Sequence, residues 1–210
     1  MKKARIFRWK RFRDDDRGSM AVELVMVVPI LMWIVLSTYV YFDLFRNEAN
    51  AHRAALTIAD MFSREEDAID SAYLNGARSL LQTLTLDDDN PDFRVTVYRY
   101  QESDDTYRRI WSRTRGVATG LDDGDLADLK LAARLPVMAD GDRSILVETF
   151  TEYTPPFNTG IRSLTNFFQS SGGSPREEVD TVNFATFTVI RPRFTPTLCW
   201  DRAPPDNDLC

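Results

Sequence analysis

Apolar residues run without an intervening charge from Leu24 to Phe42, a stretch of nineteen positions. A helix of that length extends about 28 Å, close to the hydrocarbon thickness of a bilayer. Beyond this stretch, apolar residues recur every three or four positions, which predicts that the helix continues. We expect one long helix over residues 19–61, a joint near Ser63 and a second helical stretch to about residue 84. Ser63 and Glu66 have the spacing of a capping box at this joint, and one unbroken, bent helix is the alternative.

The second half of the chain alternates apolar and polar side chains, as β-strands do. Four strands are predicted, over residues 93–100, 107–114, 144–153 and 179–190. The first two form a hairpin, and the fourth has apolar residues on both faces, which indicates a central strand. A shorter helix is expected over residues 122–135. The predicted fold class is α+β, a long N-terminal membrane-spanning helix followed by an antiparallel sheet of about four strands.

Charge is distributed unevenly along the chain. Residues 1–18 contain eight Lys or Arg against three Asp, whereas the other 192 residues contain 18 Lys or Arg against 29 Asp or Glu, a net charge of −11. Basic residues beside the apolar stretch place the N-terminus in the cytoplasm by the positive-inside rule, and later residues outside the inner membrane. The acidic outer part excludes nucleic-acid binding, which requires a basic face.

Five segments follow from these patterns. We expect a basic cytoplasmic leader (1–18), a transmembrane helix (19–42), a helical extension (43–86), a periplasmic α+β domain (87–198) and a C-terminal disulfide loop (199–210). Cys199 and Cys210 are the only cysteines, and the oxidising compartment outside the membrane permits them to pair. Two free thiols are the alternative. Neither a redox nor a metal site is expected, because no C-x-x-C motif and no nearby His accompany them.

Residues typical of catalysis are sparse. The single histidine, His52, is predicted to lie on the helix just outside the membrane, without a Cys or another His beside it. Two aspartate-rich segments, 87–89 and 122–125, lack the full pattern of a calcium loop and are interpreted as solvated loops. No nucleophile motif, P-loop or metalloprotease motif is present. We therefore expect no enzyme activity, no cofactor, no metal and no small-molecule substrate.

Glu23 stands immediately before the apolar stretch, five residues after Gly18. A carboxylate within a membrane helix costs about 2.5–3.5 kcal/mol at the helix centre and less near its end, so a functional reason is the default interpretation. A Gly, four residues, a Glu and then an apolar helix is the arrangement of a type IV prepilin cleavage site. A cleaved secretory signal and a plain signal anchor are the alternatives. The first needs a shorter apolar core, and the second has no use for Glu23.

Residues 17–29 resemble the N-terminus of TadE-like pseudopilins. The resemblance rests on Gly18 and Ser19, on the Ala-Val-Glu triplet that ends at Glu23, and on the apolar helix with the early Pro29. That family belongs to the tight-adherence (Tad, or Flp-type) pilus systems of bacteria. The resemblance covers roughly residues 17–60. The segment from Tyr153 to Pro156 resembles the family's Tyr-x-Pro region more weakly. TadF-like pseudopilins fit as well, whereas the larger TadG-like proteins fit less well because this chain leaves no room for their added domain.

The resemblance implies a pilin-like sheet domain and cleavage after Gly18 by a membrane prepilin peptidase. It also implies a role as a minor pilin, with other pilins, pseudopilins and the Tad assembly platform as partners. Cleavage would leave a charged amine on Ser19, and Glu23 lies one helical turn away, where the two charges would pair in a low-dielectric assembly.

The alternative function is an unprocessed, single-pass envelope protein whose periplasmic domain binds another protein. The segment from Pro155 to Phe168 either completes the core or forms a contact surface for a partner or the membrane face.

Overall fold

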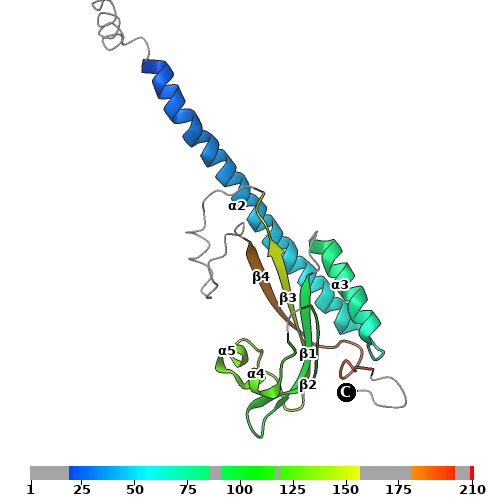
Figure 1. Ribbon diagram of the computed structural model, residues 1–210. Helices are drawn as coiled ribbons and strands as arrows, with labels where there is room; N and C mark the ends of the chain where they lie inside the picture. The colour runs from blue at the N-terminus through cyan, green and yellow to red at the C-terminus, as the bar shows by residue number, and fades with distance from the viewer. Residues whose placement is uncertain (1–18, 86–90, 117–118, 157–180, 202–208) are drawn as a thin grey trace, which may run out of the picture.

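The computed structural model describes residues 19–85, 91–116, 119–156, 181–201 and 209–210. A single long helix, α2 (Ser19–Arg64), extends far beyond the rest of the molecule at its N-terminal end, and its C-terminal half lies along a β-sheet (Figure 1). A second helix, α3 (Ser71–Thr85), turns back beside α2. The α+β fold predicted from the sequence is confirmed.

The corner between α2 and α3 differs from the predicted capping box. Ser63 is still inside α2, and its hydroxyl donates a hydrogen bond to the Asp60 carbonyl oxygen at 2.8 Å. The chain then leaves the helix after Arg64, and α3 begins only where the Asp70 carboxylate accepts the Tyr73 amide at 2.8 Å. The prediction of a cap at Ser63 was wrong because a residue still within one helix cannot begin the next.

Four antiparallel strands form one sheet in the order β2-β1-β3-β4. They are β1 (Asp92–Gln101), β2 (Thr106–Arg115), β3 (Arg143–Tyr153) and β4 (Val182–Ile190). The prediction that the fourth strand is central was wrong, because β4 is the edge strand of the described sheet. Its two faces are both apolar because one packs toward α2, while Phe187 and Val189 on the other face pack against a second cluster.

The larger core lies between the sheet and the two long helices. Its best-buried members are Phe62 of α2, Leu74 and Leu81 of α3 and Phe93 of β1, all with no exposed surface. Four small or branched residues of α2 allow the helix to approach the sheet closely: Ala54, Ala55, Ile58 and Ala59. The sheet therefore holds only the part of α2 that supplies these residues, and this decides which part of the helix remains free.

The opposite face of the sheet is partly covered by two short helices, α4 (Asp123–Ala127) and α5 (Leu129–Ala132). Here Tyr98, Leu121 and Leu126 belong to a smaller core cluster. The single helix predicted over residues 122–135 is instead broken at Asp128, whose ψ of 125° is not helical. The Asp128 side chain accepts the Lys130 amide, so this residue ends one helix and caps the next.

The C-terminal segment fastens the corner between α2 and α3. The Arg193 amide donates to the Ser63 carbonyl oxygen at 2.8 Å, where helix α2 ends. Ile69 and Trp200 form an isolated parallel bridge, and Trp200 packs into the main core. A disulfide joins Cys199 to Cys210 beside this bridge, with 4.6 Å between the two Cα atoms.

Candidate functional site

The N-terminal half of α2 is an isolated apolar helix. Every side chain from Met20 to Leu36 is exposed, and most of them are large and hydrophobic. Among the described residues, α2 is the one helix long and apolar enough to cross a membrane, by length and composition. An apolar surface of this size is not stable in water, so the helix suggests a membrane anchor.

The predicted site residues fall at both ends of this apolar helix. Gly18 lies outside the described residues, and Ser19 is the first residue of α2. Glu23 and Leu24 are exposed on its first turns, and Pro29 lies within the helix without ending it. Phe42, at the far end, has 73% of its surface exposed. The side chains of Glu23, Leu24, Pro29 and Phe42 are all exposed, which leaves them available to a membrane or to a neighbouring helix.

Burial along α2 begins just before the apolar stretch ends. Ser37 and Val40 are the first buried residues along α2. One turn later, the Asp43 carboxylate accepts a hydrogen bond of 2.7 Å from the hydroxyl of Tyr153, the last residue of β3. Burial and this hydrogen bond raise the pKa of Tyr153 well above its ordinary value of 10.0. The phenol therefore stays protonated at neutral pH and remains the donor to Asp43.

Two carboxylates thus bracket the apolar stretch, in different states. Asp43 has a partner on the sheet, whereas Glu23 is exposed on a part of the helix that touches no other element. Glu23 and Asp43 are the charged residues nearest to the stretch on either side. An exposed carboxylate at the start of an apolar helix can accept hydrogen bonds from a cationic group in the same or another chain.

Aspartates 122, 123 and 125, which the sequence places in a calcium-like loop, bind backbone amides. Asp122 and Asp125 form a capping box at the start of α4, each accepting the other's amide at 2.8–2.9 Å. Asp123 accepts the Arg109 amide at 2.6 Å, which ties α4 to β2. The other aspartate-rich segment, 87–89, and most of the segment from Pro155 to Phe168 lie outside the described residues. His52 is exposed on α2.

The predicted disulfide between Cys199 and Cys210 is confirmed. Its neighbours hold it in place: the Ile69 amide donates to the Cys199 carbonyl oxygen at 3.0 Å, and the Trp111 indole donates to the Leu198 carbonyl oxygen at 2.8 Å. Disulfides persist in oxidising compartments, so this bond suggests that the sheet domain lies outside the cytoplasm. That side agrees with the one indicated by the basic residues 1–18.

Sequence reasoning missed two interactions of the sheet domain. The bond between Asp43 and Tyr153 links residues 110 positions apart; the only signal for it was that Tyr153 ends a predicted strand just before two prolines. Arg94 and Glu148 form an ion pair of 2.6 Å, largely shielded from solvent, on the face away from α2. Nothing in the sequence identifies these two residues as partners, because their strands must first align in register.

Comparison of the chain with protein families, with curated proteins and with solved structures finds no match. The architecture itself is informative. A long apolar N-terminal helix whose second half packs on a four-stranded antiparallel sheet is a pilin-like arrangement. This observation, together with a single carboxylate at the start of the apolar helix, defines the candidate site.

Proposed function

We propose that this protein is a minor pilin or pseudopilin that takes part in the assembly of a Tad-type (Flp) type IV pilus. The observation that carries the proposal is the isolated apolar half of α2, with Glu23 as its only charged residue, continuous with the half that packs on the sheet. Such a helix can anchor the chain in the inner membrane before assembly and pack among other apolar helices afterwards. TadE-like and TadF-like pseudopilins both fit this description.

In this proposal a prepilin peptidase cleaves after Gly18 and leaves Ser19 with a charged amine. Ser19 and Glu23 are four residues apart in α2, so their positions lie on one face of the helix. Pairing of that amine with the Glu23 carboxylate, within one subunit or between two, would neutralise both charges in the apolar interior of an assembly. The pair would fix the register between neighbouring helices rather than add much stability.

Processing is the step to test first. Mass spectrometry of the membrane-bound protein should find Ser19 as its N-terminus in cells with an active prepilin peptidase. Gly18→Ala should reduce the amount of this product, because the substituted junction no longer offers the flexible backbone of glycine. A chain that keeps Met1 in peptidase-positive cells would contradict the proposal and favour an unprocessed envelope protein. A reporter fused after Cys210 should be active only outside the cytoplasm.

A further inference from the structure

Three arginines face one another across the sheet at the end farthest from Tyr153. The register of the strands places Arg99 of β1 opposite Arg108 of β2 on one side and opposite Arg143 of β3 on the other. We call these three residues the arginine row. Side chains directly opposite on neighbouring strands interact, and like charges in those positions are destabilising. The row therefore destabilises this end of the sheet, which suggests that the three arginines serve an interaction with another molecule.

Two of the three charges have no carboxylate partner among the residues that the structure describes. Arg108 forms an exposed ion pair of 3.3 Å with Asp104. Within the part of the chain that the structure describes, neither Arg99 nor Arg143 forms an ion pair or a side-chain hydrogen bond. Arg99 is exposed, and Arg143 is half-buried. The outer part of the chain is acidic overall, so unpaired arginines here are not explained by a shortage of carboxylates.

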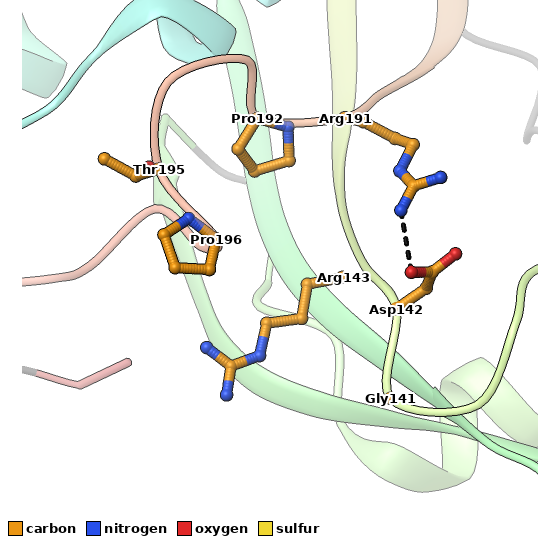
Figure 2. Close-up of a pocket in the computed structure, with 7 residues that line it drawn as sticks. All are labelled: Gly141, Asp142, Arg143, Arg191, Pro192, Thr195 and Pro196. Carbon is orange, nitrogen blue, oxygen red and sulfur yellow. Dashed lines mark ion pairs between the residues drawn. The ribbon is translucent and has the colours of Figure 1, made fainter.

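A groove of about 570 Å³ opens beside Arg143, between the start of β3 and the segment after β4. Its other lining residues are Gly141, Asp142, Arg191, Pro192, Thr195 and Pro196. Figure 2 shows that Arg191 is directed at Asp142, with which it forms an ion pair of 2.7 Å, whereas Arg143 points away from that pair. Arg143 thus belongs to both the groove and the arginine row.

We propose that the arginine row and this groove form a binding site for a carboxylate-rich polypeptide segment of a partner protein. The guanidinium fork matches a carboxylate with two parallel hydrogen bonds. Neighbouring strands are about 4.8 Å apart, so the row spans about 10 Å, the length of three residues of an extended chain. A short acidic run laid across the strands would pair with all three arginines and relieve their mutual repulsion.

The size and position of the site favour a polypeptide over other anions. A row of about 10 Å beside an open groove is larger than a single phosphate requires. Strand β3 runs alongside α2 from Arg143 to Tyr153, about 33 Å for its 11 residues. If the Tyr153 end of β3 faces the membrane, the arginine row at the other end lies several Debye lengths from the lipid headgroups. The Debye length is about 8 Å at physiological salt.

The first test uses Arg99→Glu in the full-length chain, purified in detergent. This change turns the row into Arg-Glu-Arg, in which opposite charges face each other, so the melting temperature should rise by about 1–4 °C. Binding of a labelled hexaglutamate peptide, about 20 Å long when extended, should weaken at least tenfold. The matched control is Arg53→Glu, the same charge change on an exposed position of α2, which should leave binding within about twofold because Arg53 belongs to neither the arginine row nor the groove.

A second variant and a competitor complete the test. Arg143→Gln should also weaken hexaglutamate binding, without creating a new ion pair that alters stability. A hexaglutamine peptide should not bind. Equal losses in Arg99→Glu and Arg53→Glu would overturn the proposal. So would full displacement of hexaglutamate by inorganic phosphate at a concentration equal to that of the peptide's carboxylates, which would indicate a small-oxyanion site. The proposal does not depend on the pilus assignment, because it concerns only the sheet domain.

Discussion

The two halves of α2 are one continuous helix in two different environments. From Met20 to Leu36 the helix exposes every side chain, whereas Ser37 is the first of a series of buried residues, and those from Ala54 to Phe62 pack into the core against the sheet. Both halves are rich in apolar residues, so hydrophobicity alone does not separate them. The difference is where the apolar residues lie: all around the helix in the first half, and on one face in the second.

This contrast shows how one helix can serve two tasks. A helix that is apolar all round is stable only in a membrane or inside an assembly, whereas the amphipathic half needs the sheet for its apolar face. The bond between Asp43 and Tyr153 lies where one environment gives way to the other. Changes in the first half should therefore affect insertion and assembly, and changes in the second half should affect folding of the sheet domain.

The largest effect is expected from Glu23. If its carboxylate pairs with the Ser19 amine during assembly, Glu23→Leu and Glu23→Gln should still be inserted and cleaved, but surface pili should be lost or strongly reduced. The thermal stability of the sheet domain should not change, because Glu23 touches no part of it. Electron microscopy of pili and the amount of mature protein measure the two effects. Normal piliation in both variants would mean that the carboxylate has no role in assembly.

Phe62→Ala tests the packed half of α2. Phe62 is fully buried and its ring lies near those of Tyr73 and Phe93, with centroids 5.7 and 6.4 Å away. Truncation of such a side chain should lower the free energy of unfolding by about 3–5 kcal/mol, measured by urea denaturation in detergent. Leu56 lies on the same helix with 57% of its surface exposed, so Leu56→Ala should change the free energy of unfolding by less than about 1 kcal/mol. Similar losses in both would show that the sheet does not hold this half.

Removal of the disulfide should loosen the corner where α2 ends. Cys199→Ser with Cys210→Ser opens a loop with a sequence separation of 11, which by loop entropy lowers the free energy of unfolding by about 3 kcal/mol. The wild-type chain under reducing conditions is the matched control and should show the same loss. Before reduction, neither thiol should react with an alkylating agent. Ready labelling of both thiols without reductant would contradict the bond.

Tyr153→Phe tests the junction between the two halves. The variant keeps the ring, which lies 6.3 Å from that of Phe184, but removes the donor to Asp43. Loss of a hydrogen bond to a charged group should lower the free energy of unfolding by about 1.5–3 kcal/mol. Asp43→Asn, which keeps an acceptor without the charge, should cost less. If Asp43→Asn is the more damaging variant, the charge of Asp43 serves something other than Tyr153.

The smallest effect concerns alkaline pH. Because the pKa of Tyr153 is raised above 10.0 in the folded chain, the unfolded state loses its proton first. The contribution of this residue to stability is therefore complete below about pH 10 and decreases as the pH rises further. Tyr98, deeply buried between the strands and α4, has a raised pKa for the same main reason. Urea denaturation from pH 8 to 11 should show a shallower decline for Tyr153→Phe than for the wild type.

Local patterns in the sequence determined much of the fold. A largely apolar stretch of nineteen positions without a charge indicates a helix long enough to cross a membrane, and alternating side chains such as those of residues 93–100 indicate a strand, because each pattern depends only on neighbours along the chain. The four strands therefore appear within a few residues of the predicted positions. The disulfide could also be predicted from the sequence, because the chain has only two cysteines and their spacing closes a short loop. Glu23 stood out for the same reason, as the charge immediately before an apolar stretch.

The tertiary structure decided what depends on strand order and register. The apolar residues on both faces of β4 read equally well as a central strand, and only its neighbours show that it is an edge strand covered by α2 and a second cluster. The partners of Asp43 and Glu148 lie 110 and 54 residues away, respectively. The arginine row likewise exists only because three strands align Arg99, Arg108 and Arg143. Such contacts come from the pairing of distant segments, and the energy that selects one pairing is shared over the whole core rather than encoded in any local run of residues.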